Sequence, residues 1–103
     1  MDRLRRARLY AALPGNTLAG AAARYGIGIS ALRRAPAVTP SLDDLLLHGL
    51  EHPAQAAGLV EWMDYVNHAR PSPAEIEAIL RRLEGEGLVH RTDRGWVRRD
   101  GWP

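Results

Sequence analysis

Residues 72–99 read SPAEIEAILRRLEGEGLVHRTDRGWVRR, a stretch that changes from helical to extended spacing along its length. Ser72 is a good helix cap, Pro73 suits the first helical position, and Glu75 lies three residues after the cap. Apolar residues then recur at the spacing of one helix face, at Ile76, Ile79, Leu80 and Leu83. The first half of this stretch therefore predicts a helix over residues 72–85 that packs on a core.

The second half of the stretch predicts an antiparallel hairpin. Gly85 and Gly87 end the helix, and residues 88–92 and 96–99 have the composition of two short strands. Asp93-Arg94-Gly95 between them is typical of a hairpin turn.

Two more helices are expected before this stretch. Ser41 and Asp44 have capping-box spacing, and the leucines that follow form one apolar face, at Leu42, Leu45, Leu46 and Leu50, with Leu47 beside it. Pro53 ends or interrupts this helix. Residues 56–68 then carry Leu59, Val60, Met63 and Val66 at helical spacing.

Three helices followed by a hairpin resemble the winged helix-turn-helix superfamily over about residues 39–100. The most specific part is Ile79-Leu80-Arg81-Arg82-Leu83-Glu84-Gly85-Glu86-Gly87-Leu88-Val89-His90-Arg91. In winged-helix proteins such a segment forms the end of the third helix, a tight glycine turn and the first wing strand. The resemblance implies that residues 72–85 are the recognition helix and that the hairpin is the wing.

The N-terminal part has its own helical pattern. Residues 2–13 predict a basic amphipathic helix, which Pro14-Gly15 ends. Residues 17–35 resemble a compact helix-turn-helix, with Asn16 or Thr17 as the cap, Gly26 in the turn, and a second short helix that Pro36 ends. A helical hairpin that only packs on the winged helix is the alternative.

The fold class expected is thus mainly α with a small β-hairpin, a winged helix-turn-helix with an N-terminal helical extension. The expected domains are a basic helical unit over residues 1–36 and a winged-helix domain over residues 39–103.

The charges are unevenly distributed along the 103 residues. All 14 basic residues are arginine. Residues 1–36 hold seven arginines and one aspartate, giving +6, residues 37–87 are acidic, and residues 88–103 carry +2. Basic ends around an acidic middle favour a protein that touches nucleic-acid phosphates with its ends.

Duplex DNA is therefore the expected partner, bound by a homodimer with a regulatory role in transcription. The predicted DNA-binding residues are Arg24, Ser30, Arg33, Arg34, Arg91, Arg94 and Arg98. Arginines hold phosphates, while Ser30, Arg33 and Arg34 on the second helix of the N-terminal unit are expected to reach base edges.

A protein-protein adaptor is the alternative function, because the expected recognition helix carries Glu75 and Glu77, which repel phosphate. Glu75, Glu77 and Trp102 are the candidate interface residues, since aromatic side chains dominate interface energetics. Trp62 and Trp96 are expected in the core, because the chain has no phenylalanine.

No enzymatic activity, cofactor or metal is expected. The chain lacks cysteine and lysine, and Gly26-Ile27-Gly28 lacks the rest of a phosphate-binding fingerprint. His48 and His52 are four residues apart on an expected helix, but no third ligand is placed by the sequence. Residues 2–8 are too polar for a signal peptide, and no apolar run could span a membrane, so a cytoplasmic protein is expected.

Overall fold

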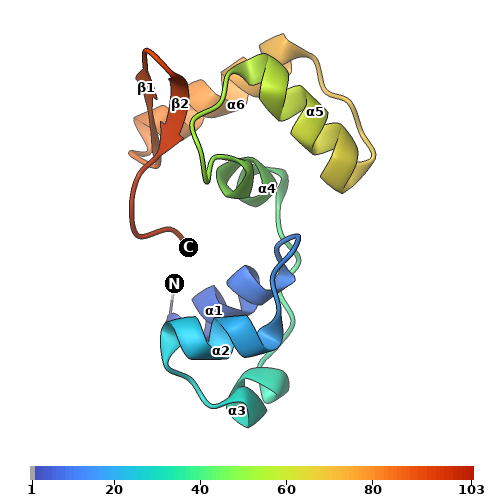
Figure 1. Cartoon of the computed structure of the whole chain (residues 1–103), viewed down its shortest axis with the longest axis vertical. Helices are drawn as coiled ribbons and strands as arrows, with labels where there is room; N and C mark the ends of the chain where they lie inside the picture. Colours follow the sequence, from blue (N-terminus) through green and yellow to red (C-terminus); the bar gives the residue numbers. More distant parts are fainter. Residues whose placement is uncertain (1) are drawn as a thin grey trace. The chain divides into compact units, whose positions relative to one another are not determined.

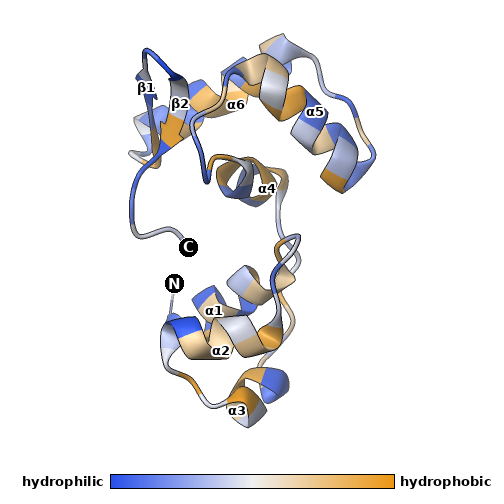
Figure 2. Cartoon of the chain, in the orientation of Figure 1, coloured by the Kyte–Doolittle hydropathy of each residue, from blue (hydrophilic) through white to orange (hydrophobic). Residues whose placement is uncertain are grey.

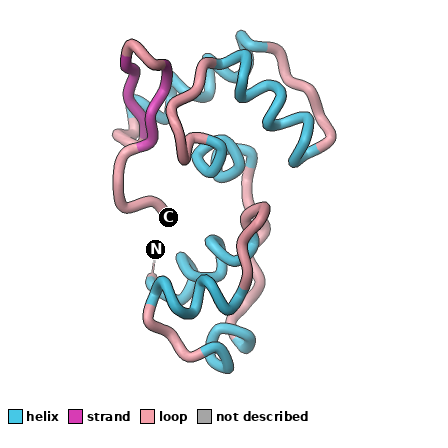
Figure 3. The backbone as a smooth tube through the Cα atoms, viewed as in Figure 1, coloured by secondary structure: helices cyan, strands magenta, loops and turns pink. Residues whose placement is uncertain are grey.

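The computed structural model describes residues 2–103 and shows a mainly helical chain with one antiparallel hairpin (Figures 1 and 3), which confirms the expected mainly α class. Its elements are α1 (Arg3–Ala12), α2 (Leu18–Tyr25), α3 (Ile29–Arg34), α4 (Leu42–Gly49), α5 (Ala56–Asn67), α6 (Pro73–Gly85), β1 (Val89–Thr92) and β2 (Gly95–Arg98). Two units form, one of residues up to Ser41 with Pro103, the other Leu42–Trp102. Every helix within residues 2–103 is too short or too polar to cross a bilayer.

Local capping defines the helices of the first unit. Asp2 Oδ1 accepts a hydrogen bond from Arg5 N at 2.8 Å, and Thr17 Oγ1 accepts one from Gly20 N at 3.0 Å. Gly26 ends α2 in the left-handed region at φ 63°, where glycine carries no steric penalty. One buried cluster of this unit is made of small side chains with one leucine, namely Ala7, Ala21, Ala22 and Leu32, and Leu9 and Leu13 are buried as well. Alanines let α1 and α2 approach closely.

The second unit has the larger core, formed by leucines of α4, apolar residues of α5 and α6, and Trp96 of β2. Figure 2 shows hydrophobic and hydrophilic residues alternating along α5 and α6, as expected of helices with one buried face. Two details of α4 were predicted wrongly. Leu42, expected on the apolar face, is 41% exposed because it begins the helix, whereas Leu47 is buried. The helix also ends at Gly49, four residues before Pro53.

Gly49 ends α4 where the helix meets the Trp62 ring of α5. A Cβ at position 49 would lie 2.6 Å from Trp62 Cδ1, so only glycine fits without displacing the ring. The indole Nε1 of Trp62 donates to Leu45 O at 2.8 Å. This contact fixes α4 against α5, and the Trp62 side chain is half-buried.

The hairpin pairs β1 with β2 in the register Val89↔Arg98, His90↔Val97, Arg91↔Trp96 and Thr92↔Gly95. The turn is therefore only Asp93-Arg94, and Gly95, expected in the turn, begins β2. Ala54, between α4 and α5, pairs with Trp96 on the other edge of β2: Trp96 N donates to Ala54 O at 2.8 Å and Ala54 N to Trp96 O at 3.1 Å. The segment before α5 thus holds the hairpin on the helices.

Gly95→Ala should lower the free energy of unfolding by about 2–4 kcal/mol, through backbone strain and a steric clash. Gly95 has φ +112°, and a Cβ there would lie 2.6 Å from Ala54 O. Urea unfolding followed by tryptophan fluorescence measures the change. Gly87→Ala is the control, because Gly87 has φ +79° but a Cβ at that position would meet no atom within 4 Å. Equal destabilisation by the two variants would contradict a steric role for Gly95.

Candidate nucleic-acid interface

The exposed face of α3 carries three of the expected DNA-binding residues. Ser30, Arg33 and Arg34 are all exposed, while Leu32 is fully buried and anchors the helix. Positions i, i+3 and i+4 share one face of a helix, so the three polar side chains project together. The helix ends at Arg34 because Ala35, which precedes Pro36, is extended (φ −68°, ψ 149°). Two adjacent guanidinium groups thus stand at the C-terminal end of a short helix.

Arg24, in the last turn of α2, lies over two tyrosine rings. Its guanidinium carbon is 4.8 Å from the centroid of Tyr10 and 5.8 Å from that of Tyr25. The two rings meet edge to face at 5.9 Å. Stacking of this kind orients a guanidinium while its in-plane N–H groups stay available for hydrogen bonds.

The remaining arginines of the first unit have few carboxylates with which to form ion pairs. Asp2 is the one acidic residue of residues 2–41, and its carboxylate caps α1. Arg6 donates from Nε to Pro103 O at 2.7 Å. Within the described chain, six arginines of this unit form no ion pair: Arg3, Arg5, Arg8, Arg24, Arg33 and Arg34.

The arginines of the hairpin fall into two groups. Arg91 stacks on the Trp96 ring at 5.1 Å and pairs with Glu77 at 3.5 Å. Arg98 is half-buried, donates from Nη1 to Leu47 O at 2.8 Å, and lies 5.2 Å from the centroid of Trp102. Arg94 at the turn is instead exposed, with its guanidinium unpaired in the described chain. Of the three hairpin arginines expected to contact DNA, only Arg94 has a guanidinium with no partner in the described chain.

Arg99, which follows β2, is a second available cation that the expected site did not include. Its side chain is exposed, and within residues 2–103 no hydrogen bond or ion pair occupies its guanidinium. Neighbouring residues of a strand point to opposite faces of the sheet, and the hydrogen bond from Arg98 Nη1 to Leu47 O shows that Arg98 is the one that points toward α4.

Ion pairs occupy most of the charges on α6. Glu77 pairs with Arg81 at 3.8 Å as well as with Arg91. Arg82 donates from Nη2 to both carboxylate oxygens of Asp43 on α4, at 2.7 and 2.8 Å, and this raises the pKa of Arg82. Glu75 is exposed. The outer face of α6 therefore offers a carboxylate and few available cations.

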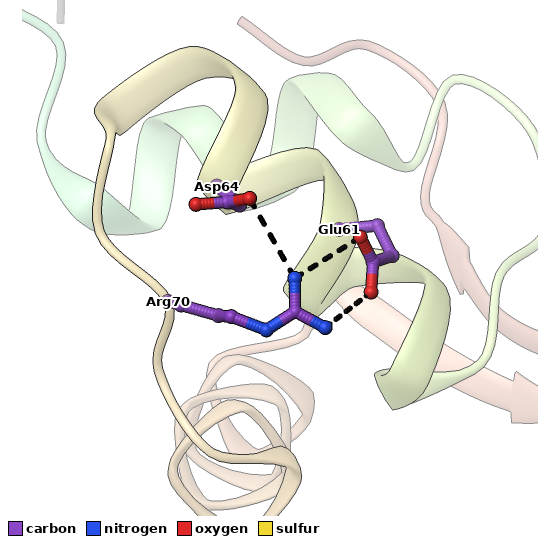
Figure 4. A network of polar contacts seen from close by, with 3 residues as sticks. All are labelled: Glu61, Asp64 and Arg70. Carbon is purple, nitrogen blue, oxygen red and sulfur yellow. Dashed lines mark hydrogen bonds and ion pairs between the residues drawn. The ribbon is translucent and has the colours of Figure 1, made fainter.

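The connection from α5 to α6 is held by a small polar network (Figure 4). Arg70 binds both carboxylate oxygens of Glu61, one through Nη1 at 3.1 Å, and its Nη1 also lies 3.6 Å from Asp64. The hydrogen bonds from Arg70 hold the pKa of Glu61 below its usual value. The chain leaves α5 through His68 at φ 52°, so the network braces a bent segment.

The aromatic residues of the second unit differ in exposure. Trp96 is buried, while Trp102 and Trp62 are half-buried and pack against the core of the second unit. Tyr65 of α5 is 78% exposed, and its ring lies 6.3 Å from that of Trp62.

The expected helical pair of His48 and His52 is wrong, because α4 ends at Gly49 and His52 lies outside the helix. Within residues 2–103 no group of three His, Asp or Glu side chains could hold a metal ion. His48 instead packs on Trp62, with ring centroids 5.7 Å apart.

Comparison of this chain with protein-family models, with curated protein sequences and with solved structures finds no match.

Arg98→Met should lower the free energy of unfolding by about 1.5–3 kcal/mol, because the Leu47 carbonyl loses a charged donor. Thermal and urea unfolding measure the effect. Arg99→Met removes the same charge from the exposed neighbouring residue and should change stability by less than about 0.5 kcal/mol. Equal effects of the two variants would contradict a structural role for Arg98.

The carboxyl group of Glu61 should titrate below pH 4.5, and in Arg70→Gln its midpoint should return toward 4.5. A lowered pKa in the folded state means that the ion pair adds stability above the unfolded-state pKa and loses it as the pH falls through the folded-state value. Carbon-detected NMR of the side-chain carboxyl measures the midpoint, and Arg81→Gln is the charge-matched control. A Glu61 midpoint that is unchanged in Arg70→Gln would contradict the pairing in Figure 4.

Proposed function

We propose that this protein binds duplex DNA and regulates transcription, docking through arginines of the first unit and the tip of the hairpin. The observation that carries the proposal is the set of first-unit arginines without ion pairs, beside a single acidic residue. Clustered cations with no internal counter-charge attract a polyanion and release its condensed counterions on binding.

The proposal includes a winged-helix architecture for the second unit. Three helices, α4, α5 and α6, precede the β1–β2 hairpin, and Ala54 adds a one-residue bridge to the free edge of β2. The last helix begins at Ser72, whose Oγ accepts from Glu75 N at 3.2 Å. In this architecture the hairpin is the wing, and Arg94 stands at its tip.

The charge distribution favours α3 and the wing tip over α6 as the DNA-contacting elements. Glu75 and Glu77 stand on the N-terminal half of α6, where a carboxylate repels phosphate and can accept only from cytosine amino groups. Arg33 and Arg34 on α3 have no such neighbours and can donate to phosphates or to guanine edges. We therefore assign base contact to α3, and phosphate contact to Arg24, Arg94 and Arg99.

A cytoplasmic homodimer is part of the proposal. Dimers place two identical DNA-contacting helices on two half-sites, which compensates for the short reach of a six-residue helix such as α3. Size-exclusion chromatography with light scattering, with and without DNA, measures the number of chains.

The double variant Arg33→Gln, Arg34→Gln should bind random duplex DNA more weakly than the wild type, with a salt slope (log K against log salt concentration) shallower by about 2. The reason is that a protein which neutralises two fewer phosphates releases fewer condensed counterions when it binds. Fluorescence anisotropy at several salt concentrations measures both quantities.

A control for net charge is available in the same chain. Arg70→Gln, Arg81→Gln removes the same charge from two exposed arginines that are already paired with carboxylates. This variant should retain the wild-type slope. If the wild type does not bind duplex DNA at low salt, the proposed function is wrong. If both double variants weaken binding equally, only net charge matters and the role of α3 is wrong.

A protein adaptor is the second candidate, favoured by one observation on α5. Tyr65 is 78% exposed beside the half-buried Trp62, and exposed tyrosines are frequent anchors in protein interfaces. Glu75 and the half-buried Trp102 would then add an acidic and an aromatic contact. In that case, the wild type fails to bind DNA, and a partner captured by the wild type is lost with Tyr65→Ser but retained with Arg33→Gln.

A further inference from the structure

A pocket of about 410 Å³ lies within the first unit, between the start of α1 and the segment that follows α3. One wall is formed by Leu4, Arg5 and Arg8 of α1, with Asp2 at its edge. The other wall is the run Ala35–Thr39. A volume of this size, lined by both apolar and polar groups, lies in the range of small-molecule sites.

Arg8 lines this pocket and carries a polar atom that has no partner in the described chain. Its Nε is fully buried and has no hydrogen-bond partner in the described chain. Buried donors are nearly always paired, so an unpaired one calls for an explanation. Arg5 stands one turn before Arg8 on the same helix face, and its guanidinium also lacks a carboxylate partner among residues 2–103. Two guanidinium groups therefore line one pocket, and neither forms an ion pair in the described chain.

Asp2 limits the charge that the pocket can accept. Its Oδ1 accepts from Arg5 N at 2.8 Å as the cap of α1, so the carboxylate is held at the pocket edge. With Arg5 and Arg8 the local sum is +1, which matches a ligand with one negative charge better than a dianion.

We propose that this pocket binds a small organic monocarboxylate with an apolar body. The planar guanidinium of Arg8 matches the geometry of a carboxylate, which would accept from its terminal Nη groups. The apolar body would contact Leu4, Pro36 and Val38. A free phosphate would meet the same arginines but would leave the apolar wall unused. This inference goes beyond DNA binding, and its test contains no nucleic acid.

The bound ligand would contact the segment on which α3 ends. Ala35, the first residue of the wall, directly follows Arg34. A carboxylate between α1 and this segment would restrain the C-terminal end of α3, where Arg33 and Arg34 stand.

The test uses the full chain and three probes: 3-phenylpropionate, its neutral amide, and inorganic phosphate. Two-dimensional ¹H–¹⁵N NMR follows the Nε–Hε signal of Arg8 and the backbone amides of Ala35, Ala37, Val38 and Thr39. The carboxylate should shift these signals saturably. The amide and phosphate should bind at least about tenfold more weakly, since each lacks either the charge or the apolar body.

Arg8→Gln should weaken carboxylate binding by about tenfold or more, through loss of the charged donor. Arg3→Gln is the matched control, because it removes the same charge from α1 outside the pocket, and it should bind as the wild type does. If Arg8→Gln does not retain the folded spectrum, Arg5→Gln serves as the pocket variant. Absence of saturable shifts, equal binding of the amide or of phosphate, or wild-type affinity in the pocket variant would overturn the proposal.

Discussion

The backbone pairing of Ala54 with Trp96 is the interaction on which the second unit depends. Two hydrogen bonds join the segment before α5 to β2, and they hold the Trp96 indole among the leucines of α4 and the apolar faces of α5 and α6. The indole Nε1 is buried without a partner in the described chain, so the side chain is held by apolar packing. Gly95 must stay without a side chain for this pairing to form. A single close approach of two backbones therefore sets the position of the hairpin, and with it the position of Arg94.

The distribution of acidic residues then decides which arginines are available to a partner. In the second unit, carboxylates engage Arg70, Arg81, Arg82 and Arg91 in ion pairs. Among residues 2–41 of the first unit there is one acidic side chain, which is used to cap α1. Arginine is abundant in both units, but in the described chain most exposed arginines without an ion pair lie in the first unit, while the second unit contributes Arg94 and Arg99. This difference, rather than the net charge of +2, supports the proposed DNA contact through α3.

Local chemistry predicted most of the elements, because caps and helix ends depend on residues a few positions apart. Thr17, Gly26 and the Ser72-Pro73 pair stand at the expected helix ends. The Ala54 bridge was not predictable, since a one-residue strand has no periodicity. The candidate site was harder to predict than the helices, because its contacts also join residues that are far apart in the sequence. Arg98 looks like any exposed strand arginine until its contact with Leu47, 51 residues away, is known. The structure distinguishes Arg94 from Arg98 by the exposure of their side chains, and their spacing in the sequence does not reveal this difference.

The most direct test of the central claim is a map of the DNA-contacting surface, obtained by ¹H–¹⁵N NMR of the full chain with a random duplex at low salt. The account predicts shifts and broadening at the backbone amides of residues 28–35 and at the hairpin turn around Arg94. It predicts little change over residues 72–80, where the carboxylates of α6 face outward. Changes concentrated on α6, with α3 unaffected, would contradict the claim that unpaired arginines select the contact surface.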